Sequence, residues 1–113
     1  MRVQTRITGV RRFLPLLFAL LFFPAVSALA DAEATYKSKC AGCHGPDGTG
    51  STPAGMAMKV RDFHSPEVQK ETDAELTDII TNGKNKMPKY GDKLKDSDIK
   101  ELVGYLRLLG KKK

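Results

Sequence analysis

The sequence predicts an all-α fold of three to five short helices, and three observations support that prediction. Apolar residues recur three and four positions apart in the second half of the chain. Residues that can cap a helix, such as Ser, Thr and Asp, stand just before those segments, and glycines follow them. The 113 residues contain no sustained alternating run of β-branched residues, which would predict a strand.

The first helix is expected from Asp31 to Cys40, where Ala32, Tyr36 and Cys40 lie four residues apart on one face. The following segment, from Gly42 to Gly55, contains five glycines and two prolines. Glycine and proline at this density favour an irregular loop, so no regular element is expected there.

Two helices are predicted in the middle of the chain by their start signals. Ser65-Pro66-Glu67 places a cap residue, a proline and an acid in sequence, which predicts a brief helix ending near Lys70. Thr72 and Glu75 have the spacing of a capping box, and the helix they open is expected over residues 73–81. Gly83 is expected to stop it with a left-handed conformation.

The last helix is predicted by the strongest apolar periodicity in the chain. Asp96 or Ser97 is expected to cap it, and Gly110 to end it. Its apolar face consists of Ile99, Leu102, Val103, Leu106 and Leu109.

The first thirty residues differ in composition from the rest. Residues 1–12 carry four arginines and no acid, and an apolar run from Phe13 to Ala28 follows. This is typical of a secretory signal peptide, and Ala28-Leu29-Ala30 favours cleavage after Ala30. Residues 1–30 are therefore expected to be a signal peptide, with an uncleaved anchor as the alternative, and residues 31–113 to form one domain.

Removal of that segment changes the charge of the chain. The whole chain has nineteen Lys and Arg residues, and four of them are arginines of the expected signal peptide. Without these four, fifteen basic residues stand against thirteen acidic ones, so the formal charge falls from +6 to +2. The high isoelectric point is thus no evidence for nucleic-acid binding, and no nucleic-acid partner is expected.

The most specific motif is a run of five residues, Cys40-Ala41-Gly42-Cys43-His44. Two cysteines at this spacing followed by histidine form the attachment signature of a c-type haem. Cys40 and Cys43 would form thioethers with the haem vinyl groups, and His44 would be the proximal iron ligand.

Other functions of a Cys-x-x-Cys motif are less well supported. A zinc site needs further Cys or His ligands, but the chain has no third cysteine and only one other histidine, His64. A thiol-disulfide oxidoreductase site would need flanking strands, which the sequence does not predict.

Met87 is the favoured second iron ligand, because it lies in a lysine-rich loop before Pro88 and outside any apolar helical face. Met56 and Met58 follow His44 closely and are better explained as packing residues. His64 is interpreted as a surface residue. The Pro53 carbonyl is a candidate hydrogen-bond acceptor for the outer ring nitrogen of His44.

These residues resemble the class I cytochrome c family. The resemblance covers residues 31–113 and is carried by the early haem motif, by the segment from Leu76 through Met87-Pro88, and by Leu102 to Arg107. It implies the cytochrome c fold, with the helices wrapped around one covalently attached haem c. It also implies that the first and last helices cross, so that Tyr36 meets Leu102 and Tyr105.

The resemblance implies a soluble, monomeric electron carrier of the periplasm, with no catalytic residues. Its partners would be an upstream cytochrome complex and a terminal oxidase or reductase, in a respiratory or photosynthetic chain, and it would meet the membrane only through them. Lys84, Lys86, Lys89 and Lys93 are expected to dock on acidic patches of those partners. The alternatives are a haem sensor or peroxidase-like protein with a labile sixth ligand, a thiol-disulfide oxidoreductase, and a permanent subunit of a respiratory complex.

Overall fold

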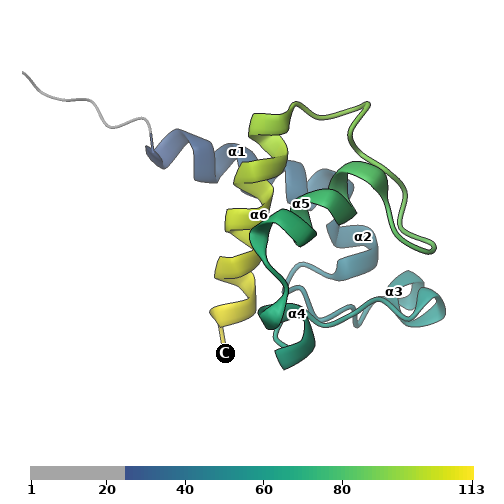
Figure 1. The fold of residues 1–113 in the computed structure, drawn as a ribbon. Coiled ribbons are helices and arrows are strands. Elements are labelled where there is room, and N and C mark those ends of the chain that lie inside the picture. Colours follow the sequence, from purple (N-terminus) through teal and green to yellow (C-terminus); the bar gives the residue numbers. More distant parts are fainter. Residues whose placement is uncertain (1–24) are drawn as a thin grey trace, which may run out of the picture.

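The computed structural model describes residues 25–113, which form six helices and no strand (Figure 1). The all-α prediction is confirmed, but residues 25–113 form six helices rather than the expected three to five. In chain order the helices are α1 (Ala25–Lys39), α2 (Ala41–His44), α3 (Pro53–Met58), α4 (Pro66–Lys70), α5 (Asp73–Asn82) and α6 (Asp96–Lys111).

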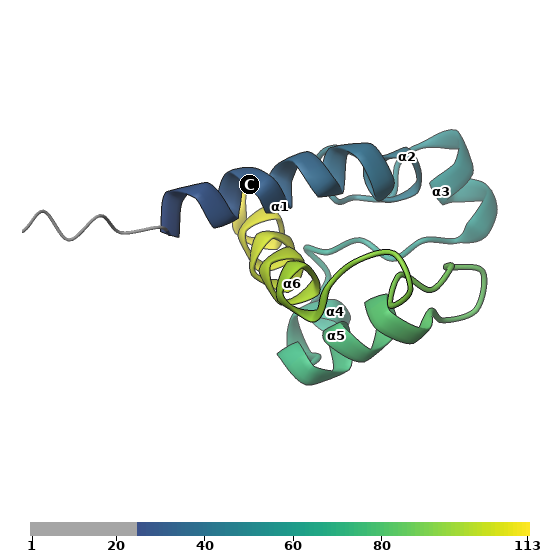
Figure 2. The ribbon, with the colours of Figure 1, turned by 90° about the horizontal axis from the view of Figure 1, so that it is seen from above.

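The first and last helices cross, as the family resemblance implies (Figure 2). Tyr36 of α1 is 0% exposed, and its ring centroid lies 5.3 Å from that of Tyr105 of α6. Ala32 is buried one turn earlier in α1, where its small side chain lets the two helices approach. The crossing fixes the start of the haem motif against the C-terminal helix.

A single cluster of buried apolar side chains joins α1, α4, α5 and α6. Leu76 and Ile80 supply the buried face of α5, whereas Ile79 is only partly buried. The α6 face is buried as its periodicity predicts, except that Leu106 is partly exposed. The buried residues of this helix are Ile99, Leu102, Val103, Tyr105 and Leu109.

The expectation that no regular element lies between Gly42 and Gly55 is wrong. The helix α2 forms one turn directly after α1, with the His44 N–H donating to the Cys40 carbonyl at 3.0 Å. The helix α3 begins at Pro53, and the Thr52 hydroxyl accepts a hydrogen bond from the Gly55 N–H at 2.9 Å. Thr52-Pro53 is the same kind of helix-start signal as Ser65-Pro66. The glycines on both sides of it favour a loop, and for that reason no helix is expected there from the sequence.

The expected start of the first helix is also displaced. α1 begins at Ala25, six residues before Asp31, so the predicted cleavage position after Ala30 lies inside the helix. Residues 1–24 of the predicted signal peptide lie outside the described residues. Within residues 25–113, no helix combines the length and apolar character that crossing a membrane requires.

The predicted starts of α4 and α5 are confirmed. Ser65 caps α4, and Thr72 forms a capping box with Glu75 at the start of α5. The N-cap of α6 is Lys95 rather than Asp96 or Ser97, and its backbone N–H donates to the Asp98 carboxylate at 3.2 Å. The cap lies one residue before Asp96 because the Asp98 carboxylate, in the first turn of the helix, accepts the hydrogen bond of the Lys95 N–H.

The predicted glycine stops hold only in part. Gly83 follows α5 with φ 75° and ψ 167°, which is not the left-handed helical conformation. A Cβ at this position would lie 2.6 Å from the Met87 carbonyl oxygen, so glycine is required for the return of the loop. Gly110 lies inside α6, which continues to Lys111.

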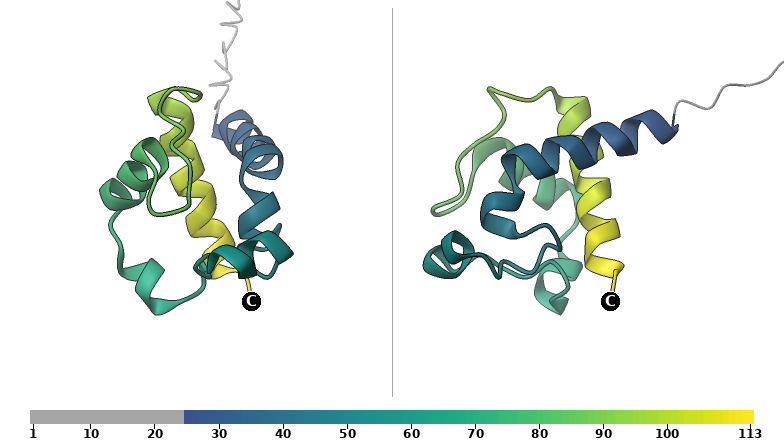
Figure 3. Two further views of the ribbon diagram at one scale, coloured as in Figure 1. Left: turned by 90° about the vertical axis from the view of Figure 1, so that its right-hand side faces the viewer. Right: turned by 180° about the vertical axis from the view of Figure 1, so that it is seen from behind.

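The segment between α5 and α6 leaves the helices as a long loop at one side of the molecule (Figure 3). The loop carries Met87 and all four lysines of the predicted docking face. Hydrogen bonds from the Tyr90 and Gly91 N–H groups to the Ile80 and Thr81 carbonyls, at 2.9 and 3.0 Å, tie the loop back to α5.

Candidate haem site

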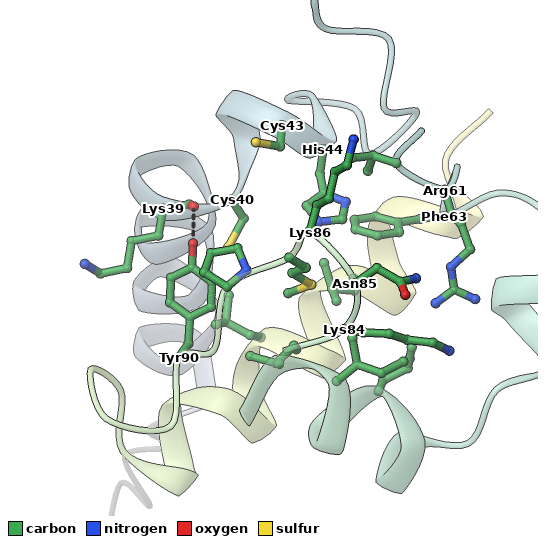
Figure 4. Close-up of a pocket in the computed structure, with 18 of the residues that line it drawn as sticks. Lys39, Cys40, Cys43, His44, Arg61, Phe63, Lys84, Asn85, Lys86 and Tyr90 are labelled. Carbon is green, nitrogen blue, oxygen red and sulfur yellow. Dashed lines mark hydrogen bonds between the residues drawn. The ribbon is translucent and has the colours of Figure 1, made fainter. Parts of the chain in front are cut away.

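A cavity of about 440 Å³ lies between the haem motif, the loop and the inner faces of α5 and α6. All four predicted site residues, Cys40, Cys43, His44 and Met87, line it. The first three come from the α1–α2 corner (Figure 4), and Met87 comes from the loop after α5. The fold thus brings together two sequence segments that lie more than forty residues apart.

The other sulfur and imidazole candidates are placed differently. Met58 lines the cavity, as expected for a packing residue. Met56 is 66% exposed and does not line it. His64 does not line the cavity either, and its Nδ1 lies 2.7 Å from an Asp62 carboxylate oxygen.

The corner between α1 and α2 positions the haem motif. The Cys40 N–H closes the last turn of α1 on the Tyr36 carbonyl at 2.9 Å, and the single turn of α2 follows. The Tyr36 hydroxyl donates to the Gly45 carbonyl at 2.6 Å, which fastens the far end of the motif to the helix crossing. Tyr36 therefore holds both ends of the motif, through its backbone carbonyl at Cys40 and its hydroxyl at Gly45.

Burial shapes the chemistry of the cysteines. It raises the pKa of the Cys40 thiol to about 11, so this sulfur is a poor thiolate at neutral pH. Thiol-disulfide exchange needs the opposite shift, because the thiolate is the attacking species. The alternative of a thiol-disulfide oxidoreductase is not favoured by this environment.

The His44 imidazole is partly buried. Burial, followed by the positive charge of Arg61, lowers its pKa. Its Nδ1 is enclosed by protein and has no hydrogen-bond partner among residues 25–113. The predicted hydrogen bond to the Pro53 carbonyl is therefore absent. Because Nδ1 is enclosed, Nε2 is the nitrogen that remains available to a metal.

The Met87 loop is closed at its base. The Met87 N–H donates to the Lys84 carbonyl at 2.9 Å, and the Lys84 N–H donates to the Met87 carbonyl at 3.3 Å. Residues 84–87 therefore form a tight turn. The Tyr90 hydroxyl donates to the Lys39 carbonyl at 3.1 Å and links the loop to the end of α1. These contacts bring the loop to the same cavity as the haem motif.

The four lysines of the predicted docking face have different surroundings. Lys84 and Lys86 line the mouth of the cavity. Lys89 pairs with Asp92 at 2.8 Å, and the Lys93 ammonium lies 5.5 Å from the centre of the Tyr90 ring. Sequence reasoning missed three more basic residues that line the cavity, Lys39, Lys59 and Arg61.

Comparison with known proteins identifies the family. The family model described as cytochrome c oxidase, cbb3-type, subunit III matches residues 27–106. The chain belongs to this family of c-type cytochromes. It is a small class I cytochrome that carries one covalently bound haem c with iron. The cytochrome is an electron-transfer protein and not an enzyme.

Curated relatives cover most of the chain. Cytochrome c6 of Porphyra purpurea is 32% identical over 92 residues, 79% of this chain and 81% of that protein. Cytochrome c6 of Bumilleriopsis filiformis is 31% identical over 79 residues, 69% of this chain and 87% of that protein.

Solved structures agree with the fold. The KustC0563 c-type cytochrome superposes with a TM-score of 0.67 at 31% identity, covering 72% of this chain and 99% of that one. The c-type cytochrome XoxG from Methylobacterium extorquens AM1 gives a TM-score of 0.57 at 28% identity, covering 74% of this chain and 50% of that one.

The lining of the cavity fits a covalently held haem. It offers two free cysteines, an imidazole whose pKa is lowered by burial, and a thioether. Most of the other walls are apolar, and they include Val68, Leu76, Ile80, Leu102 and Leu106. Elsewhere in residues 25–113, no group of three or more His, Cys, Asp or Glu side chains gathers to hold a metal ion.

Proposed function

We propose that the cytochrome is an exported one-electron carrier in which His44 and Met87 are the axial iron ligands. Cys40 and Cys43 hold the haem through thioethers. The observation that supports this proposal is the shared cavity: four side chains from two distant segments line one apolar space. When bound, the haem supplies reversible one-electron exchange between ferrous and ferric iron.

The side chains around the haem set its reduction potential. The soft thioether of Met87 favours the ferrous state and raises the reduction potential. The apolar walls act in the same direction, because a buried site disfavours the additional charge of ferric iron. Two fixed ligands, one on a helix corner and one on a tied loop, limit rearrangement during transfer.

The basic residues at the cavity mouth provide a docking surface for acidic partners. Lys84 and Lys86 are exposed beside Met87, and no acidic side chain lines the cavity with them. Positive charge at this position steers association with a negatively charged donor or acceptor and depends on ionic strength. The basic, apolar N-terminal segment supports export to the periplasm.

The test compares three proteins matured with haem-attachment machinery: the wild type, Met87→Ala and Met58→Ala. The wild type should show a low-spin c-type spectrum with the far-red ferric band of sulfur ligation, and should refuse carbon monoxide. Met87→Ala should lose the band and bind carbon monoxide, because the iron then has an open position.

Met58→Ala is the matched control, since it removes a thioether from the same cavity. It should retain the band. If the band disappears in Met58→Ala and persists in Met87→Ala, Met87 is not the ligand. If the wild type binds carbon monoxide readily, the carrier proposal is wrong and the sensor alternative replaces it.

A further inference from the structure

The loop that carries Met87 is fastened to α5 at both of its ends. At its start, the Gly83 N–H donates to an α5 carbonyl at 2.9 Å. After Met87, the chain returns to the same helix, where the Tyr90 and Gly91 N–H groups donate to α5 carbonyls at 2.9 and 3.0 Å. Residues 73–91 therefore form one unit, the α5 unit, and Met87 keeps its place relative to that helix.

The haem motif lies outside the α5 unit, at the corner between α1 and α2. The separation of the two proposed axial ligands therefore depends on how the α5 unit is held against this corner. Among residues 25–113, a single hydrogen bond joins the α5 unit to residues 25–45: the Tyr90 hydroxyl donates to the Lys39 carbonyl at 3.1 Å. No ion pair within the described part of the chain joins the same two segments.

The acceptor of this bond is available because α1 ends at Lys39. Carbonyls in the last turn of a helix have no partner within the helix. Figure 4 shows the Tyr90 hydroxyl meeting the Lys39 carbonyl beside the cavity, next to Cys40. The bond thus lies one residue from the first cysteine of the haem motif.

Tyr90 is itself held in place by its surroundings. Its carbonyl accepts hydrogen bonds from the Lys93 and Leu94 N–H groups, both at 2.9 Å. Its side chain lines the cavity and packs against the buried cluster. The Lys93 ammonium lies over the ring, 5.5 Å from its centre, where a cation is attracted to the aromatic face. The hydroxyl is therefore presented to α1 from a fixed position.

We propose that Tyr90 is a positioning residue for Met87: its hydrogen bond to the Lys39 carbonyl clamps the α5 unit against the haem motif and keeps the thioether at the iron. An external ligand reaches the iron on this side only after Met87 has moved away. That movement parts the two segments and breaks the clamp. The hydroxyl thus keeps an electron carrier from binding external ligands. The inference rests on the proposed ligation by Met87.

The test measures how tightly imidazole replaces Met87 in the ferric, haem-loaded protein, followed by loss of the far-red sulfur band. Tyr90→Phe removes only the hydroxyl and should retain the band when imidazole is absent. Because the open form lacks the clamp in any case, this variant should bind imidazole roughly two- to twelve-fold more tightly than the wild type, as expected for loss of one hydrogen bond. Wild-type affinity in Tyr90→Phe would overturn the inference.

Tyr105→Phe is the matched control, because it deletes the same group at another site. Tyr105 is 8% exposed and does not line the cavity, and its hydroxyl makes no hydrogen bond within the described residues. Thr72→Ala controls for stability, since it removes a capping hydroxyl at the start of α5, the end away from the loop. Both variants should bind imidazole as the wild type does. A gain in either control as large as that in Tyr90→Phe would overturn the inference, because general destabilisation would then explain it.

The inference and the proposed function fail in different ways. A wild type without the far-red band has no Met87 sulfur on the iron, and this result overturns the proposed function. A wild type that shows the band, with a Tyr90→Phe variant that binds imidazole no more tightly, overturns the inference alone.

Discussion

Tyr36 shows how much one side chain does in this small protein. Its ring occupies the crossing of α1 and α6, against Tyr105, and touches the edge of Phe63. Its hydroxyl satisfies the Gly45 carbonyl directly after the haem motif. Removing one partner of a buried hydrogen bond of this kind lowers the stability by about 1–3 kcal/mol, because the other partner is left unpaired. The residue therefore links the stability of the crossing to the position of His44.

His64 and Asp62 form a pH-sensitive pair outside the cavity. The hydrogen bond to Asp62, with a smaller effect from the Asp47 charge, raises the pKa of His64. The same pair lowers the pKa of Asp62. The stability contributed by His64 is complete below its ordinary pKa of about 6.5 and is lost as pH rises through the raised value. The stability contributed by Asp62 is lost as pH falls through the lowered pKa of Asp62.

Asp62→Asn should therefore bring the pKa of His64 back down towards its ordinary range. A nuclear magnetic resonance titration of the His64 ring protons measures the shift directly. Asp47→Asn is the comparison, since it removes only a charge effect, and should lower the pKa less. An unchanged titration midpoint in Asp62→Asn would show that the pair does not form in solution.

Helix-start signals explain which elements could be predicted from the sequence. Ser65 and Thr72 carry their information locally, within three residues, and the helices they cap were predicted to within one residue. The α2 and α3 turns were missed because the glycines around them favour a loop. The cap of α6 was misplaced because Asp98 serves Lys95 from inside the helix.

Some features of the candidate site likewise have a local signal in the sequence, and others do not. Cys40, Cys43 and His44 are adjacent in sequence, and the sequence itself places them together. Met87 could be named from its local setting, although only the fold brings it to the cavity. The stack of Phe63 on His44 and the hydrogen bond of Tyr90 to Lys39 have no local signal, because their partners lie nineteen and fifty-one residues away.

The capping box of α5 gives a prediction at the scale of one helix. The Thr72 hydroxyl accepts from the Glu75 N–H at 3.2 Å, and the Thr72 N–H donates to the Glu75 carboxylate at 2.7 Å. Thr72→Ala should lower the free energy of unfolding by about 1 kcal/mol, because it removes an N-cap side chain. Denaturant unfolding of the haem-loaded protein measures this loss.

Ser97→Ala is the control, because Ser97 is exposed in the first turn of α6 and does not cap it. Its effect should stay below about 0.5 kcal/mol, as for most surface substitutions. Equal losses in the two variants would mean that the cap of α6 is at Ser97 after all.

At the scale of the whole molecule, the apolar core surrounds a cavity. The buried cluster contains eleven residues, and six of them also line the 440 Å³ space. A domain of this size has little apolar surface to bury on its own. The haem therefore supplies a large part of the core that the side chains do not fill.

Loss of covalent attachment should unfold the protein. Cys40→Ser combined with Cys43→Ser removes both proposed attachment points, and the chain should lose cooperative thermal melting and much of its helical circular dichroism. Wild-type chain made without attachment machinery retains both cysteines and is the control for the serine substitutions. A cooperative transition in either haem-free protein would show that the side chains form a sufficient core alone.

The crossing of α1 with α6 also governs the order of events when the chain is made. The two helices that grip each other are the first and the last, so the core stays incomplete until synthesis reaches its final residues. The motif from Cys40 to His44 emerges about fifty residues before α6 begins. During that interval both thiols lie on a chain that has not yet closed around them. The topology itself thus leaves time for the attachment machinery to reach the cysteines.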